Sequence, residues 1–143
     1  MSQLFISKKS RNSGSVVKLR GHYYNNNNDK CFQEITQINA IQVKATMGNQ
    51  LLITLTVPDV WCDKANDWGW FAIKVNGEIL TRGLITSGTD GQRVPISLQT
   101  VVEVKADQDY EIKAAWCNGT GTENRNCNIG EYSEAVLTVL QLD

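Results

Sequence analysis

Histidine is almost absent from this sequence, with His22 as its single example. One imidazole with no nucleophile nearby in the sequence leaves general acid–base catalysis without its usual side chain. The acids that a glycosidase would need, for which Asp63, Asp67 and Glu78 are candidates, show no spacing that selects an opposed pair. We therefore predict that the protein is not an enzyme.

Metal and nucleotide motifs are also missing. No two cysteines have the C-x2-C spacing of a zinc site, and one histidine cannot complete a Cys2His2 set. Asp59, Asp63 and Asp67 recur at every fourth position, but without the spacing of an EF-hand they are typical of a solvated loop. There is no Walker motif, G-x-S-x-G or dinucleotide fingerprint. We predict no metal site and no cofactor.

Long hydrophobic runs and an excess of charge of one sign are absent as well. No apolar run approaches the ~20 residues of a membrane helix, so we predict no membrane insertion. Fourteen Lys and Arg against fifteen Asp and Glu leave a net charge of -1, which argues against a nucleic-acid partner. The opening MSQLFISKKSRNSGS has no apolar h-region, so a conventional signal peptide is not predicted.

A period of two dominates the hydrophobic pattern, and a helical period is scarcely present. With only two prolines, short alternating runs are separated by turns of Gly, Asn and Asp, and 143 residues suit one domain. The predicted strands are 50–57, 69–75, 78–84, 93–105, 109–116 and 133–142, with weaker candidates at 16–19 and 38–45. We predict an all-β fold, an antiparallel β-sandwich, as a single domain over residues 1–143.

Three local features refine this prediction. Asn76-Gly77 between two alternating runs is a strong hairpin signal. Trp70 and Phe71 are adjacent in one strand and must point to opposite faces, so only one of them enters the core, which Trp116 is also expected to join. The last strand is apolar on both faces, which indicates either a second subunit covering it or a central strand of a monomer.

The four cysteines at positions 31, 62, 117 and 127 suit an oxidising compartment if they are paired. Cys117 and Cys127 bracket a polar loop that a disulfide would staple, and Cys31 and Cys62 would then pair by elimination. Sequence alone allows three connectivities, and four buried thiols are the alternative.

Three tryptophans, Trp61, Trp68 and Trp70, fall within ten residues and are interleaved with Asp and Asn. A flat indole covers the C–H face of a sugar ring, while polar side chains bind the hydroxyls at its rim. This cluster is the physical case for a carbohydrate site. The alternative is that at least one indole plugs an end of the sandwich.

The order of pieces from about Gln50 to Trp116 resembles the TNF/C1q-like jelly roll: a strand ending in VP, a polar loop, GWFAI, NG, RVP and a strand ending in Trp. In particular it is similar to the trimeric TNF-like lectin domain of bacterial fucose-binding superlectins. In that family the sugar lies in a cleft between protomers, held by aromatic residues and an arginine. The resemblance implies a homotrimer that binds glycans.

Position by position, the resemblance places Trp61 and Trp70 on tyrosines of the family's site, Thr86 on a site threonine and Arg93 on a site arginine. An arginine fork can hold two vicinal hydroxyls at once. The alternative role for Arg93 is a salt bridge, for example with Asp90.

Two positions depart from the family's pattern. Ser87 stands where the family has an aromatic residue, and Arg125, the only arginine in the loop after Trp116, is the candidate for a second site arginine.

The function that the resemblance implies is a trimeric, extracellular or cell-surface lectin that recognises glycans with a fucose-like or galacto-configured sugar. The alternative is a structural subunit of an extracellular fibre, filament or phage or viral appendage.

Overall fold

The computed structural model describes residues 5–9, 17–20, 32–45, 50–62, 68–86, 88–118, 126–130 and 133–142. None of these residues is helical. The strands are β1 (Phe5–Lys9), β2 (Val17–Arg20), β3 (Gln33–Glu34), β4 (Ile41–Lys44), β5 (Gln50–Val57), β6 (Val60–Cys62), β7 (Trp68–Val75), β8 (Glu78–Thr86), β9 (Ile96–Glu103), β10 (Asp109–Asn118), β11 (Asn126–Ile129) and β12 (Val136–Leu142). The predicted all-β sandwich is confirmed.

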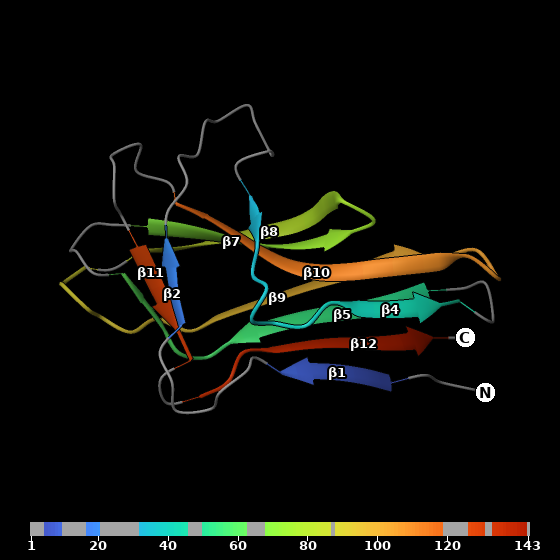
Figure 1. Cartoon of the computed structure of the whole chain (residues 1–143), viewed down its shortest axis with the longest axis horizontal. Helices are drawn as coiled ribbons and strands as arrows, with labels where there is room; N and C mark the ends of the chain where they lie inside the picture. The colour runs from blue at the N-terminus through green and yellow to red at the C-terminus, as the bar shows by residue number, and fades with distance from the viewer. Residues whose placement is uncertain are drawn as a thin grey trace.

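Two antiparallel sheets form the layers of the sandwich (Figure 1). One has the strand order β1-β12-β5-β9, and the other has the order β3-β10-β7-β8 with β4 also paired to β10. The chain passes repeatedly from one layer to the other. Among the described strands of the two layers, β3 is followed by β4 in the same layer and β7 by β8, whereas every other step changes layer. Each layer is therefore completed only when the C-terminal strands return to it.

The β7–β8 hairpin forms where the sequence predicts it. Asn76 and Gly77 both have positive φ, 50° and 81°, as the two central residues of a type I′ turn require. Glycine adopts this conformation without steric cost. The Asn76 side chain also accepts a hydrogen bond from the Glu111 backbone N–H at 2.8 Å, which ties the turn to β10.

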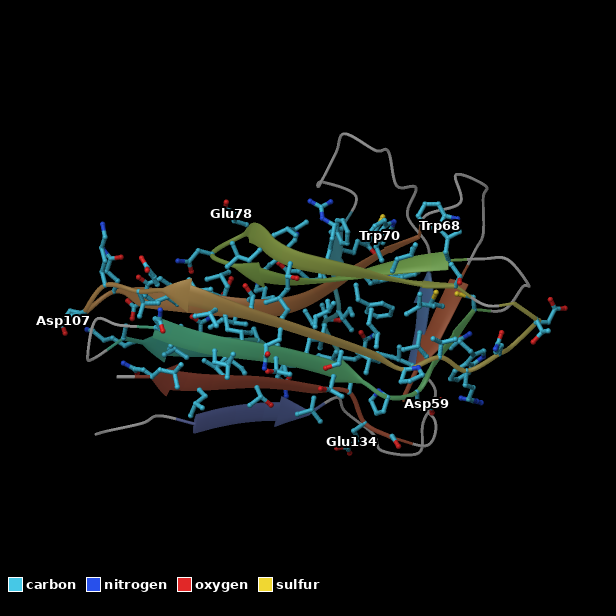
Figure 2. All side chains as sticks on the ribbon, turned by 180° about the vertical axis from the view of Figure 1, so that it is seen from behind. Asp59, Trp68, Trp70, Glu78, Asp107 and Glu134 are labelled. Atoms are coloured by element: carbon cyan, nitrogen blue, oxygen red, sulfur yellow. The ribbon has the colours of Figure 1, made fainter. Side chains whose placement is uncertain are left out.

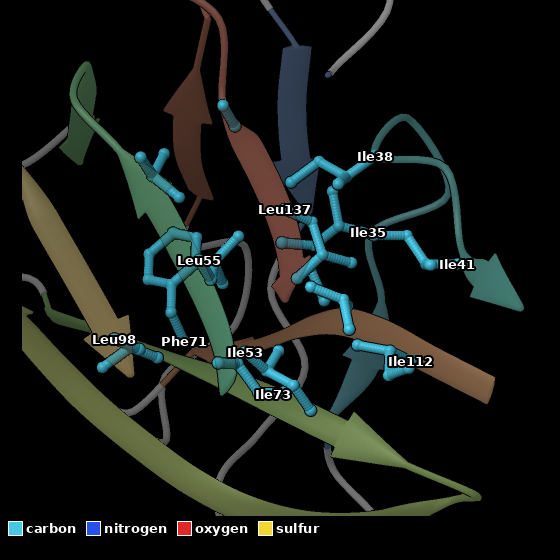
Figure 3. Close-up of a cluster of buried hydrophobic side chains, with 14 of the residues drawn as sticks. Ile35, Ile38, Ile41, Ile53, Leu55, Phe71, Ile73, Leu98, Ile112 and Leu137 are labelled. Carbon is cyan, nitrogen blue, oxygen red and sulfur yellow. The ribbon is translucent and has the colours of Figure 1, made fainter. Parts of the chain in front are cut away.

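The core lies between the inner faces of the two layers (Figure 3). The alternation of β5 buries every second residue, as the sequence pattern predicts. Buried side chains include Ile53, Leu55 and Leu137 from one layer, Phe71, Ile73 and Ile112 from the other, and Ile35, Ile38 and Ile41 from the segment containing β3 and β4. Phe71 rather than Trp70 is therefore the core residue of its pair.

Two further predictions about the core have clear outcomes. Trp116 is 2% exposed and contacts Phe71, with ring centroids 6.5 Å apart, which confirms its core position. In β12, Leu137 and Val139 are buried, whereas the alternate residues on the outer face are half-buried. The outer face of this strand is thus partly covered within one chain.

A third sheet, with the order β2-β11-β6, closes one end of the sandwich, where β2 and β11 stand steeply to the strands of the layers (Figure 1). The sequence pattern did not predict β6 or β11, which have three and four residues and therefore show the strand period only weakly. This sheet brings together segments far apart in the sequence and supports the candidate site.

Candidate functional site

The candidate site lies at this closed end and is built around Arg93. Val60 and Cys62 are buried, so the alternation of β6 turns Trp61 to the opposite side. The backbones of Trp61 and Arg93 form a single antiparallel bridge, and the Val94 N–H donates to the Val60 carbonyl at 2.8 Å. The segment leading into β9 is thereby fastened along β6.

Asp59 and Trp61 both contact the Arg93 guanidinium. Its Nη1 donates to Oδ1 of Asp59 at 2.6 Å, and its Cζ lies 3.9 Å from the centroid of the Trp61 ring. The Asp59 side chain is 5% exposed and that of Arg93 is 35% exposed. A charge-assisted hydrogen bond and a cation–π contact together hold a partly accessible arginine in one orientation.

This geometry changes the role expected of each residue. Arg93 forms a salt bridge with Asp59, a partner that the sequence did not suggest. The guanidinium covers one face of the Trp61 indole, so a sugar cannot stack on that face. Trp61 therefore supports the Arg93 guanidinium from one side.

Asp59 is a member of the cluster that sequence reasoning assigned to a solvated loop. The carboxylate is nearly buried, and its own backbone carbonyl accepts from the Gly130 N–H at 3.2 Å. The sequence does contain a pattern that could have linked Asp59 to the site. Asp59 and Trp61 are two residues apart, so both lie on one side of an extended segment.

Trp70 and Thr86 lie elsewhere, on the outer face of the β7–β8 layer. Trp68 stands opposite Thr86 and Trp70 opposite Leu84 in the strand register. The two indoles meet edge to face, with centroids 6.2 Å apart. Trp70 also packs against a small buried cluster of Phe32, Ala72, Ala115 and Cys117.

One chain thus separates the predicted site residues into two groups, Trp61 with Arg93 and Trp70 with Thr86. Figure 2 shows Trp68 and Trp70 on the side of their layer that faces away from the other layer, with Asp59 far from them. Ser87 and Arg125 lie outside the described residues.

The cysteines are arranged differently from the prediction. Cys127 stands opposite Cys62 in the β6–β11 register, and their Sγ atoms are 2.8 Å apart. Cys117 shares the outer-face cluster with Ala72 and Ala115, whereas Cys127 lies on the inner face beside Gly69. The sheet lies between Cys117 and Cys127, so the structure does not bring the predicted Cys117–Cys127 pair together. For the companion pair, Cys31 lies outside the described residues, and Cys62 faces Cys127 instead.

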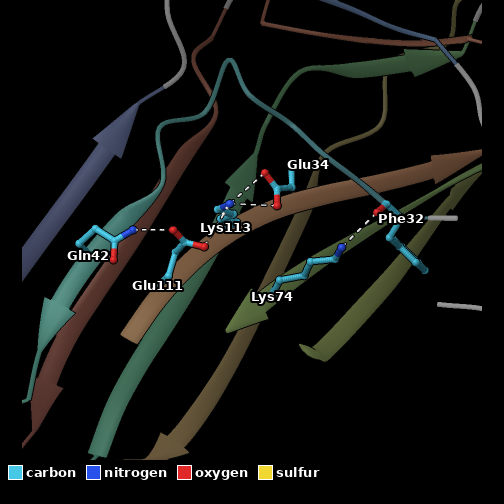
Figure 4. A network of polar contacts seen from close by, with 6 residues as sticks. All are labelled: Phe32, Glu34, Gln42, Lys74, Glu111 and Lys113. Carbon is cyan, nitrogen blue, oxygen red and sulfur yellow. Dashed lines mark hydrogen bonds and ion pairs between the residues drawn. The ribbon is translucent and has the colours of Figure 1, made fainter. Parts of the chain in front are cut away.

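A second polar cluster lies on β3, β4 and β10 (Figure 4). Lys113 Nζ donates to both carboxylate oxygens of Glu34 at 3.0 Å and contacts Glu111 Oε1 at 3.1 Å, while Gln42 Nε2 donates to Glu111 Oε2 at 2.7 Å. A cleft of about 210 Å³ beside it is lined by Glu34, Ile35, Thr36, Ile38, Asn39, Ala40 and Lys113.

The charges of this cluster are mutually stabilised. Hydrogen bonds from Lys113 and then Gln42 hold the pKa of Glu111 below its ordinary value, and Glu34 followed by Glu111 raises the pKa of Lys113. A lowered pKa keeps Glu111 ionised at neutral pH, whereas a general acid needs a raised one. These charge-assisted hydrogen bonds join β3, β4 and β10 at the surface of the sheet.

Within the part of the chain that the structure describes, no three His, Cys, Asp or Glu side chains gather as metal ligands. No helix among those residues is long and apolar enough to cross a membrane.

No protein-family model and no curated protein matches this sequence. Among solved structures, 97% of the chain is similar to 13% of dimeric latent PorU from Porphyromonas gingivalis, with a TM-score of 0.50 and 7% identity. The CBM36-1 domain of a multidomain xylanase from the hindgut metagenome of Trinervitermes trinervoides matches 98% of each chain, with a TM-score of 0.43 and 9% identity. An exo-beta-1,3-galactanase from Phanerochaete chrysosporium matches at a TM-score of 0.35 and 14% identity, over 94% of this chain and 29% of its own. The likeness to PorU is one of fold, over a small part of that longer chain.

Proposed function

We propose that this protein is a non-catalytic carbohydrate-binding domain that works outside the cell and holds a glycan against Arg93. The main support is the position of the Arg93 guanidinium, which pairs with the buried Asp59 at 2.6 Å and lies over the Trp61 ring. The Arg93 side chain is nevertheless 35% exposed. An arginine already held in place loses less conformational entropy when a ligand binds.

A sugar suits this arrangement for chemical reasons. The planar guanidinium can donate to two neighbouring hydroxyls at once, which a lysine ammonium cannot do with the same geometry. The indole beneath it adds an apolar surface next to the donors, matching the mixed polar and apolar character of a sugar ring.

We further propose that the protein is a homotrimeric, TNF/C1q-like lectin with its binding sites between protomers. The strand order of the two layers, in which the first strand pairs with the last, supports a jelly-roll arrangement. In a trimer, Trp70 and Thr86 of one protomer would complete the Arg93 group of the next, which one chain alone keeps apart. A fucose-like or galacto-configured sugar is the corresponding ligand.

The test is a glycan array on the purified protein, followed by calorimetry with any glycan retained. Arg93→Lys keeps the charge beside Asp59 but loses the fork, so we expect affinity to fall by about 1.5–3 kcal/mol, more than tenfold. Arg82→Lys is the matched control, because Arg82 also lies over an aromatic ring, Phe32 at 5.7 Å, and is not one of the residues proposed to contact the glycan. Failure of every glycan to bind the wild type, or equal binding by Arg93→Lys, would contradict the proposal.

A second candidate function, a self-assembling structural subunit, is favoured by one surface. Val101 is 53% exposed on the outer face of the β1-β12-β5-β9 sheet, opposite Leu52, which in turn stands opposite Leu140. Such a cross-strand row of apolar residues suits burial against another copy.

Light scattering on Val101→Lys tests this surface, with Leu84→Lys, 46% exposed on the other layer, as the control. If assembly uses the row, only Val101→Lys lowers the mass in solution. A wild-type monomer at micromolar concentration would remove both the trimer and the assembly function.

A further inference from the structure

The most telling contact outside the Arg93 site is between two sulfur atoms. Cys62 and Cys127 are 65 residues apart in sequence but directly opposite in the β6–β11 register, with Sγ atoms 2.8 Å apart. Both side chains belong to the hydrophobic core between the layers, and both residues are at most 1% exposed.

The surroundings are shaped around this sulfur pair. A Cβ placed on Gly69 of β7 would lie 2.8 Å from the Cys127 Sγ and 3.8 Å from the Trp116 ring. The absence of a side chain at position 69 is therefore what lets the sulfur approach β7. Cys117, in contrast, belongs to the cluster on the other face of the same sheet.

Directly opposed residues of an antiparallel pair have Cα atoms about 4.5–5.5 Å apart, within the range that a disulfide spans. We propose that Cys62 and Cys127 form a disulfide that joins β6 to β11 across the closed end of the sandwich. The bond would hold the strand that carries Trp61, whether or not the protein binds a glycan.

The chemistry balances with a small-molecule disulfide, such as glutathione disulfide, as the oxidant. One cysteine thiolate attacks it and releases one glutathione thiol, and the second cysteine then displaces the other as the Cys62–Cys127 bond forms. The two protein thiols lose two electrons and two protons, which the two released thiols carry away. Because the pair is buried, the exchange takes place as the chain folds or when β6 opens.

A peptide map of the wild-type protein, refolded with glutathione disulfide and alkylated under denaturing conditions, tests the bond. Trypsin separates all four cysteines, into 31–44, 45–64, 114–125 and 126–143, because it cuts after Lys30, Lys44, Lys64, Lys113 and Arg125. We expect 45–64 to be linked to 126–143. Linkage of 114–125 to 126–143, linkage of 31–44 to 45–64, or four alkylated cysteines would overturn the proposal.

A second readout is thermal stability with and without reductant. The bond closes a long loop, so reduction should lower Tm by about 10 °C or more. Cys117→Ala should keep this redox-dependent shift, because Cys117 is an equally buried cysteine outside the pair. A double variant, Cys62→Ala with Cys127→Ala, should lose it. If the double variant does not fold, the wild-type peptide map decides, and a wild-type Tm insensitive to reductant counts against the bond.

Discussion

Arg93→Ala is expected to destabilise the fold as well as weaken ligand binding. It removes the cation at 2.6 Å from the Asp59 carboxylate, whose side chain is only 5% exposed. Leaving a buried carboxylate without its cation costs about 3–5 kcal/mol when both partners are fully buried. Arg93 is 35% exposed, so water can replace part of the interaction and we expect about 2–3 kcal/mol.

Loss of the cation–π contact with Trp61, at 3.9 Å, adds about 0.5–1 kcal/mol. Asp59→Asn keeps the shape of the side chain and removes its charge, with an expected cost of about 1–2 kcal/mol. Because the two residues are in direct contact, the double variant should cost less than the sum of the singles by about 1–2 kcal/mol.

Urea unfolding of the wild type, both single variants and the double variant measures this cycle, provided that the m-value stays constant. Arg82→Ala serves as the control for removing an arginine beside an aromatic ring, and it should change the free energy of unfolding by no more than about 1 kcal/mol, the scale of an exposed cation–π contact. Two results would refute this account: a free energy of unfolding for Arg93→Ala within about 0.5 kcal/mol of the wild-type value, or single-variant effects that add in the double variant.

The other predictions concern the core, the hairpin and the charged cluster. Trp116→Ala should cost about 3–5 kcal/mol in urea unfolding, because the indole is 2% exposed and packs on Phe71; a loss under 1 kcal/mol would contradict that packing. Gly77→Ala places a Cβ at φ 81° and should cost about 1–2 kcal/mol, with no change in the secondary structure seen by circular dichroism. Lys113→Ala should raise the pKa of Glu111 towards its ordinary value in an NMR titration, since Lys113 is the first cause of its lowering. In the wild type, the stability that Glu111 contributes is present above its unfolded pKa and is lost as the pH falls through its lower folded pKa.

The strands of the two layers followed largely from the sequence, because a period of two is local. Residues 50–57 and the Asn76-Gly77 hairpin lie where the pattern predicts them, and β10 extends the predicted 109–116 by two residues. The alternation also required that one of Trp70 and Phe71 face inward, but only the packing decided that it is Phe71. A strand that buries large side chains on one face has apolar residues at every second position, and this pattern allows the strand to be predicted from sequence.

The candidate site and the cysteine pairing were decided by tertiary structure, because both depend on a register between distant segments. The family resemblance assigned Trp61 and Arg93 to one site together with Trp70 and Thr86. The bridge between β6 and the segment before β9 brought only Trp61 and Arg93 together, and it added the buried Asp59 to them. The β6–β11 register likewise set Cys127 against Cys62, while the sheet placed Cys117 on its other face. The register between strands that are tens of residues apart depends on how much apolar surface the whole fold buries. A short stretch of sequence does not determine that quantity.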